Sequence, residues 1–331
     1  MPATDFTILF NQFNHLKVAI VGDVMLDTYW WGHTDRISPE APVPVVSLDK
    51  KEQRVGGAAN VALNTASLGA HTTIISVIGD DEDGKSLTAL LNGHQINTQY
   101  FVSTNQRITT NKTRIMSRNQ QMMRLDSENT NDITEALENS LYHSILLYFE
   151  TDKPDVLIFE DYNKGVLTER LITKLIALCK QFAVVTTVDP KRKNFLSFKG
   201  VDIFKPNLKE VKEGLNLLIE KIDLSTLDSM HLALQKTLNH QISFITLSEK
   251  GVFYQMENDA RIIPTHVRNI ADVSGAGDTV IAVASLVYAA TKNMHLAAEM
   301  ANIAGGLVCE EVGTAAINKK LFLEECLLLL N

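Results

Sequence analysis

Residues 272–278 read Asp-Val-Ser-Gly-Ala-Gly-Asp. They separate an extended segment, residues 260–270, from a run of small and apolar residues, 279–291, that predicts a buried helix. The glycines predict a turn at the start of that helix, where backbone N–H groups without helical partners can bind an anion such as phosphate. A carboxylate at Asp278 should be ionised among these N–H dipoles and able to accept a proton from a hydroxyl.

A plainer interpretation of the same turn is purely structural. Asp272 or Ser274 would cap the helix, and the glycines would only allow the chain to turn. The turn alone does not exclude this interpretation, so the surrounding chain has to decide.

Short apolar strands alternate with helices from residue 130 onward, which predicts an α/β fold with a parallel sheet covered on both faces. Polar residues recur where these strands end. Each of them alone would be a turn residue or a cap, but together they should lie along one rim of the sheet, where ligands bind. These strand-end residues are Asp161, Asp189, Asn207 and Ser248.

Two segments, about 28–50 and 104–126, depart from this alternation and are expected to pair as a small β-sheet lid on a single domain of residues 1–331. The alternative is a decorated edge of the main sheet. Trp30, Trp31 and Val45 would be exposed on such a lid, which leads to the hypothesis of a homodimer formed through it.

Bulk composition narrows the function classes. The net charge of -8 argues against non-specific nucleic-acid binding. The three cysteines lack paired spacing, so buried reduced thiols are expected. The sequence has no signal-peptide pattern and no apolar run long enough to span a bilayer, so the expected location is cytoplasmic.

Three separated signatures resemble those of PfkB-type, ribokinase-like sugar kinases. They are Gly56-Gly57 with Asn60, Asn207 with Glu210, and the turn from Gly275 to Asp278, in which Ser274 stands where threonine is more usual. The resemblance covers essentially the whole chain. It implies a ribokinase-like three-layer sandwich with a mostly parallel central sheet and a small β-sheet lid.

A closer resemblance rests on residues 22–27, 36–45 and 117–126, which look like the kinase part of bacterial ADP-heptose synthesis enzymes. That kinase uses ATP to phosphorylate D-glycero-D-manno-heptose 7-phosphate at O1, in the synthesis of lipopolysaccharide core precursors. Many members carry a second, adenylyltransferase domain with a His-x-Gly-His motif. The sequence lacks this motif, so a stand-alone kinase is expected. The alternatives are another ribokinase-type sugar kinase and a catalytically silent sugar-binding regulatory protein.

The resemblance implies a role for each matching residue. Asp278 would deprotonate the sugar hydroxyl, and the N–H groups of Gly275, Ala276 and Gly277 would stabilise the transferring phosphoryl group. Asn207, Leu208, Lys209 and Glu210 would organise the ATP phosphates, with Glu210 holding Mg²⁺ through water. Ser248, Lys250, Gly251 and Asn302 would border the adenine. A monovalent cation is left open.

The sugar would be held by Asp27, Gly56, Gly57, Asn60 and Asp161. Its phosphate requires cations, and Arg118 and Lys191 are the predicted ones. Other cations available for this role are Lys112, Arg114, Arg124 and Lys164.

Overall fold

Eight strands form the central sheet of the computed structural model, which describes residues 4–118, 120–218 and 221–330. Their order is β14-β13-β12-β11-β10-β9-β1-β4, and every neighbouring pair from β4 to β12 is parallel. The prediction of a mostly parallel sheet is therefore confirmed. The strands are β1 (Lys17–Gly22), β4 (His71–Ile75), β9 (Val156–Glu160), β10 (Val185–Asp189), β11 (Ile203–Phe204), β12 (Ile242–Thr246), β13 (Val252–Met256) and β14 (Asp259–Ile263).

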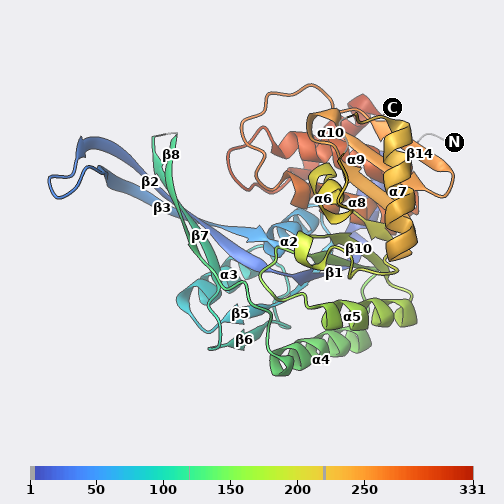
Figure 1. The fold of residues 1–331 in the computed structure, drawn as a ribbon, viewed down its shortest axis with the longest axis horizontal. Helices are drawn as coiled ribbons and strands as arrows, with labels where there is room; N and C mark the ends of the chain where they lie inside the picture. The colour runs from blue at the N-terminus through green and yellow to red at the C-terminus, as the bar shows by residue number, and fades with distance from the viewer. Residues whose placement is uncertain (1–3, 119, 219–220, 331) are drawn as a thin grey trace.

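Helices cover both faces of this sheet, as Figure 1 shows. In β1, Val18 and Ile20 belong to one apolar core, whereas Ala19 and Val21 belong to the other, because successive side chains of a strand point to opposite faces. The first core contains residues of α1 (Phe6–Gln12), α2 (Ala58–Ser67), α3 (Glu82–Gly93), α8 (Ala276–Thr291), α9 (Met294–Val308) and α10 (Lys319–Leu329). The second contains residues of α4 (Glu135–Thr151), α5 (Glu169–Phe182), α6 (Leu208–Gly214) and α7 (Leu224–Leu238).

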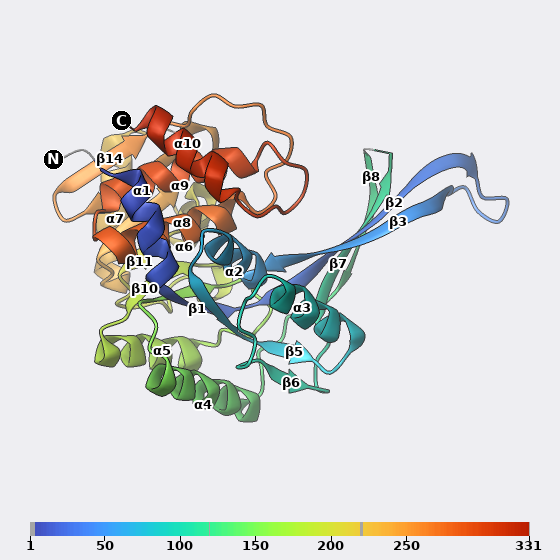
Figure 2. The same cartoon turned by 180° about the vertical axis from the view of Figure 1, so that it is seen from behind.

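A second sheet of four long strands projects from this body in both views (Figures 1 and 2). Its order is β3-β2-β7-β8, with β2 (Val24–Ile37), β3 (Pro44–Gly57), β7 (Thr110–Ser117) and β8 (Gln120–Ser127). The two unusual segments of the sequence thus pair, as expected. Trp30, Trp31 and Val45 are half-buried, so the expectation that they are exposed was wrong. In the described parts of the two lid segments, the large apolar residues that are exposed are Ile37, Val43, Leu48, Ile108, Met122, Met123 and Leu125.

Local details refine the expected elements. Helix α2 begins at Ala58, three residues earlier than predicted, because Gly57 with its φ of 59° ends β3 and turns the chain directly into the helix. Cys179, Cys309 and Cys326 are buried free thiols, as expected. Among the described residues, none of the helices combines the length and the apolar character that crossing a membrane requires.

Candidate active site

The turn at residues 272–278 starts helix α8 without a side-chain cap. Gly275 is the N-cap residue with a φ of 80°, which only glycine adopts readily. The Asp272 carboxylate instead accepts hydrogen bonds from the backbone and hydroxyl of Ser274 and from the N–H of Gly313. The purely structural interpretation of Asp272 or Ser274 as the helix cap is therefore wrong.

The glycine turn forms a short cradle of backbone donors at the start of α8. The Ala276 N–H is engaged with the Val273 carbonyl at a long 3.3 Å, whereas the following two N–H groups belong to the first helical turn and have no helical acceptor. A β-carbon placed on Gly277 would lie 3.6 Å from Asp189 Oδ2 and 3.8 Å from Lys205 Nζ. A buried cation therefore lies beside the cradle.

Asp278 is buried at the first turn of α8, and each of its carboxylate oxygens has one donor. The Asn60 amide donates to Oδ2 at 2.8 Å, and the Tyr162 hydroxyl donates to Oδ1 at 2.7 Å. Burial raises the pKa of Asp278 to about 6, although the hydrogen bonds from Asn60 and Tyr162 act in the opposite direction. The carboxylate is thus mainly ionised at neutral pH and still basic enough to take a proton.

Three strand-end residues lie on the same face of the sheet as α8. The alternation that puts Ile158 and Ile203 in the α8-side core also puts Glu160 and Lys205 on that side. Asp189 shares this side with Thr187, whose hydroxyl contacts Ser285 of α8. The carboxyl ends of β9, β10 and β11 therefore place titratable groups beneath the glycine turn of α8.

Two lysines connect these carboxylates. Lys205 Nζ lies 2.7 Å from Asp189 Oδ2, and Lys191 Nζ lies 3.2 Å from Asp189 Oδ1 and 2.8 Å from Glu210 Oε1. Burial alone would raise the pKa of Asp189, but the two lysines outweigh it and hold that pKa below its usual value. Burial would likewise lower the pKa of Lys191, yet Asp189 and Glu210 raise it. Lys191 is therefore a firmly charged residue already shared by two carboxylates.

Glu160 differs from its neighbours because neither carboxylate oxygen has a hydrogen-bond partner among the described residues. The side chain is fully buried. Burial and the charges of Asp189 and Asp278 raise its pKa well above the usual value, so the uncharged acid is favoured.

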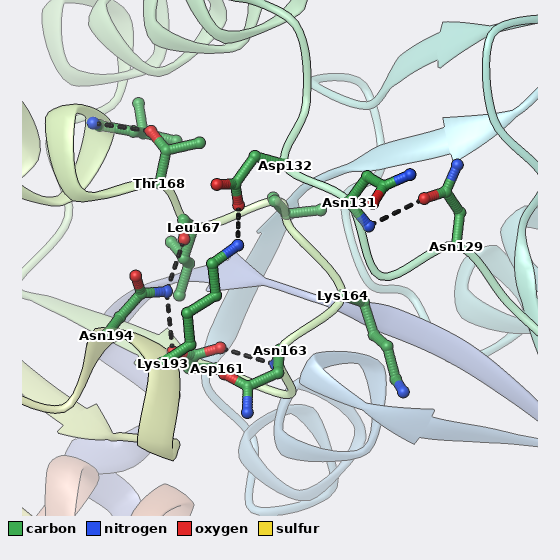
Figure 3. Close-up of polar contacts among 12 residues, drawn as sticks. Asn129, Asn131, Asp132, Asp161, Asn163, Lys164, Leu167, Thr168, Lys193 and Asn194 are labelled. Carbon is green, nitrogen blue, oxygen red and sulfur yellow. Dashed lines mark hydrogen bonds and ion pairs between the residues drawn. The ribbon is translucent and has the colours of Figure 1, made fainter.

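Asp161 follows Glu160 and points to the opposite face. Its carboxylate accepts from the Asn163 N–H at 2.8 Å and from the Asn194 amide at 3.2 Å, and Asn194 also donates to the Leu167 carbonyl. Figure 3 shows this network, with the Lys164 side chain directed away from it. Burial, together with Asp23, raises the pKa of Asp161 to about 7. The contacts of this predicted sugar ligand are thus with its own loop and with Asn194, which follows β10.

A buried carboxylate at the end of β1 fixes the same loop. Asp23 accepts hydrogen bonds from the backbone N–H groups of Tyr162, Lys164 and Val166 at 2.9–3.0 Å. These contacts give Asp23 a structural role in the loop. Its three bonds hold the backbone that presents the Tyr162 hydroxyl to Asp278.

The predicted sugar ligands gather where the lid strands leave the body. The Asp27 carboxylate pairs with Arg114 of the adjacent strand β7. A β-carbon on Gly56 would come within 2.4 Å of Asp27 Oδ2, so this carboxylate lies directly on the Gly56 backbone. The strand β2, the paired end of β3 and the start of α2 therefore bring four predicted sugar ligands together: Asp27, Gly56, Gly57 and Asn60.

The cations differ in how free they are to bind an anion. Lys112 is half-buried and forms no ion pair with a carboxylate in the described ranges, and burial and the charge of Lys164 lower its pKa. Lys164 lies 2.7 Å from Glu128. Arg118 is exposed at the outer end of β7, about 20 Å beyond Lys112 at about 3.3 Å per residue.

The predicted nucleotide ligands lie around the carboxyl ends of β11 and β12. Asn207 caps α6 and forms a capping box with Glu210, and a bridge to Thr246 joins this helix start to the end of β12. Leu208 and Lys209 form the first turn of α6. Ser248 and Lys250 lie on an exposed 3-10 turn that ends at Gly251 (φ 93°). Asn302 of α9 donates to the Pro264 carbonyl at 2.8 Å.

Within the described residues no group of three or more His, Cys, Asp or Glu side chains is arranged to hold a metal ion. Both oxygens of Glu210 have donors, namely Lys191 and the Asn207 N–H. An all-protein metal cage is therefore absent from this part of the chain.

Sequence reasoning missed three members of this site: Tyr162, Glu160 and Lys205. Strand parity could have identified Glu160 and Lys205, because each lies an even number of residues from an apolar α8-side residue of its own strand. Tyr162 carried no such signal, since its position depends on the loop that Asp23 holds.

Comparisons with known proteins agree with this architecture. The description pfkB family carbohydrate kinase matches residues 15–321. The bifunctional protein HldE of Psychromonas ingrahamii is 40% identical over 318 residues, covering 94% of this chain and 64% of the relative. The protein of the same name from Chromohalobacter salexigens is 40% identical over 321 residues, covering 95% of this chain and 63% of the relative. The chain thus spans less than two thirds of the length of these relatives.

Two solved structures show the shared fold. Escherichia coli phosphofructokinase-2 in complex with potassium has a TM-score of 0.78 at 16% identity, covering 94% of this chain and 97% of that chain. Arabidopsis thaliana ribokinase complexed with ribose and ATP has a TM-score of 0.70 at 16% identity, covering 93% and 99%. The ribokinase-like fold expected from the sequence is confirmed. Because the family match runs from β1 into α10 and includes the Asp278 turn, the chain belongs to the pfkB family of carbohydrate kinases.

Proposed function

We propose that this chain transfers the γ-phosphoryl group of ATP to O1 of D-glycero-D-manno-heptose 7-phosphate and forms heptose 1,7-bisphosphate for ADP-heptose synthesis. The observation that carries the chemistry is the buried Asp278 carboxylate beside the glycine cradle of α8. The heptose motifs of the lid strands and the 40% identity to proteins named HldE support the choice of sugar.

In this proposal, Asp278 accepts the proton of the sugar hydroxyl as its oxygen attacks the γ-phosphorus. The cradle N–H groups, from Gly275 to Gly277, face the negative charge that spreads over the phosphoryl oxygens. Each well-placed donor of this kind contributes about 3 kcal/mol to transition-state stabilisation. Lys205 adds a positive charge next to Gly277, at a point for which the sequence alone suggested no residue.

The nucleotide would lie across the ends of β11 and β12, against Asn207, the Ser248–Gly251 turn and the Asn302 end of the site. Mg²⁺ typically keeps several waters and shares nucleotide phosphates with one or two carboxylates. Glu210 is the one carboxylate proposed for the metal, and its oxygens already accept hydrogen bonds from Lys191 and Asn207. A metal of this kind would therefore be held by Glu210 through water. When bound with ATP, the metal would neutralise charge on the phosphate oxygens.

We assign the sugar phosphate to Lys112 in preference to the cations first predicted. Lys191 is already shared by Asp189 and Glu210, and Arg118 lies about 20 Å farther along β7 at about 3.3 Å per residue. Lys112 is half-buried without a carboxylate partner in the described ranges, and its strand register pairs it with Asp27. A phosphate dianion would offset the cost of partly burying this ammonium group.

We also propose that two copies of the chain associate through the lid. The outer lid carries six exposed apolar side chains, among them Met123 and Leu125. Adjacent exposed apolar groups of this kind mark association surfaces. Sedimentation of a Met123→Glu variant should give the monomer mass, whereas Leu232→Glu on α7 should leave the dimer intact; a monomeric wild type contradicts this proposal.

A coupled ADP-release assay across sugars and sugar phosphates tests the main proposal. Heptose 7-phosphate should give the highest kcat/KM, with ribose, fructose and fructose 6-phosphate at least about a hundredfold lower, a difference of about 2.7 kcal/mol. Equal or better turnover of one of these other sugars would favour the alternative, another ribokinase-type kinase. Absence of turnover with every acceptor would favour the catalytically silent protein.

A further inference from the structure

Tyr162 is the only donor to Asp278 Oδ1 in the described part of the chain, and the two donors to this carboxylate differ in character. Asn60 is fully buried in α2 and is fixed by its contacts with Asn64. Tyr162 is half-buried at the end of β9. Of the two donors, only Tyr162 is partly exposed.

The position of Tyr162 is fixed by its own backbone. Its N–H donates to the buried Asp23 carboxylate at 2.9 Å, and the N–H groups of Lys164 and Val166 share the same carboxylate. A tyrosine on a freely moving loop would lose conformational entropy each time it met Asp278. Here the three hydrogen bonds to Asp23 already restrict the loop, so little further conformational entropy is lost and the hydroxyl is held in place before substrate binds.

Two cations flank the Tyr162 ring. Lys112 Nζ lies 5.9 Å and Lys191 Nζ 5.5 Å from the ring centroid, within the range of cation–π attraction. One lysine belongs to lid strand β7, and the other follows β10. Tyr162 thus stands where the lid, the rim of the main sheet and the catalytic turn meet.

We propose that Tyr162 is a positioning residue, which holds the Asp278 carboxylate through its hydroxyl and keeps it ready to accept the proton of the sugar hydroxyl. This inference rests on the proposed role of Asp278 as the base. The hydroxyl donates to Asp278 while the second lone pair of Oδ1 remains free for the substrate.

The surrounding charges explain why such a donor is needed. Burial and Asp189 disfavour the ionised form of Asp278, whereas Lys191 and the Tyr162 and Asn60 hydrogen bonds favour it. The charged or titratable groups facing Asp278 are Glu160, Tyr162, Asp189 and Lys191. Removing the Tyr162 bond therefore leaves Asp278 more easily protonated.

A Tyr162→Phe variant tests this inference because phenylalanine keeps the ring between the two lysines. The acid limb of the kcat/KM profile should move upward by about one pH unit, while turnover at pH 9 stays within a few-fold of wild type. The KM for ATP should not change. Tyr142→Phe is the control, because Tyr142 is a half-buried tyrosine of α4 that also lies beside a lysine. It should leave the acid limb of the kcat/KM profile unchanged.

A double-mutant cycle separates this inference from the proposed function. Adding Tyr162→Phe to Asp278→Asn should not lower the residual turnover further, since the hydroxyl acts through that carboxylate. An unmoved acid limb, or an added loss in the double mutant, overturns the role of Tyr162 alone. Full turnover of Asp278→Asn would instead overturn the proposed base. Circular dichroism of each variant confirms that the losses do not come from unfolding.

Discussion

The side-chain amide of Asn60 donates a 2.8 Å hydrogen bond to Oδ2 of Asp278 and so joins the starts of α2 and α8. Both helices begin at a glycine with positive φ, Gly57 and Gly275. A β-carbon on Gly275 would lie 2.7 Å from the Asn60 amide nitrogen. The two glycine-rich turns are therefore one structural unit, in which Asn60 beside the first turn holds the Asp278 carboxylate of the second.

Replacing Asp278 with Asn removes the proton acceptor and keeps the shape of the side chain. Turnover should fall by roughly a thousandfold, the middle of the range for a lost general base. Nucleotide affinity, measured by equilibrium titration with ATP, should change little because the cradle N–H groups remain. Retention of wild-type turnover would exclude Asp278 as the base.

The pH profile should report the ionisation of Asp278. Its pKa is raised by burial to about 6, and only the ionised form accepts a proton. The kcat/KM should therefore fall about tenfold per pH unit below about 6, whereas an ordinary aspartate would stay active to about pH 4. Rates between pH 5 and 9 test this, and a flat profile down to pH 5 would contradict it.

Glu160→Gln should make the protein more stable at alkaline pH. The folded state raises the pKa of Glu160 above its unfolded value, so it binds a proton more tightly than the unfolded state. The resulting stability is complete below the unfolded pKa and is lost as pH rises through the folded pKa. Glutamine does not titrate.

Urea unfolding at several pH values measures this difference. At pH 8 the free energy of unfolding of Glu160→Gln should exceed that of wild type, because the pKa of Glu160 is raised in the folded state. The gap should shrink toward pH 5. Glu324→Gln on exposed α10 is the control. A gap independent of pH would mean that Glu160 is not the titrating group.

Gly275→Ala should weaken the Asn60–Asp278 hydrogen bond that connects the two turns. Alanine at a φ of 80° costs roughly 1–2 kcal/mol, and its β-carbon would push the Asn60 amide away from Asp278. Both the free energy of unfolding and kcat should fall. Gly93→Ala at the end of α3 is the control, because a β-carbon on Gly93 would meet no atom within 4 Å. This variant should lower neither the free energy of unfolding nor kcat. Equal effects in the two variants would show that the close contact is unimportant.

Lys112→Met should weaken binding of the sugar phosphate selectively. A hydrogen bond to a charged group is worth about 1.5–3 kcal/mol, so the KM for heptose 7-phosphate should rise roughly 10- to 100-fold. The KM for ATP should stay constant. Lys50→Met on β3 removes an exposed lysine of the same lid sheet and serves as the control. An unchanged KM would place the phosphate elsewhere.

Much of this architecture follows from local patterns in the sequence. The strand–helix alternation after residue 130 was sufficient to predict the parallel sheet. The glycine turns predicted the starts of α2 and α8 to within three residues. The pairing of the two unusual segments into one lid sheet was also predicted. These features depend on neighbouring residues, which a single sequence displays directly.

The side-chain contacts depended on longer distances and were harder to predict. Lys191 was chosen as a phosphate ligand because it follows a strand, but Glu210 on α6 and Asp189 already share its charge. Asp161 lies on the predicted rim but faces away from α8, because it directly follows Glu160 and strand parity alternates. Tyr162 could not be found, because its place depends on Asp23, 139 residues earlier.

The length of β2 and β3 determines how far the tip of the lid moves when the strands tilt. Each strand runs from the rim of the main sheet to the tip of the lid, with Asp27 and Gly56 near the rim and exposed apolar residues toward the tip, although their pairing shifts register after Trp31 and after Thr34. At about 3.3 Å per residue, a 14-residue strand is a lever about 45 Å long. A small tilt of the strands near Asp27 would therefore produce a large displacement at the tip, where an attached probe would report it.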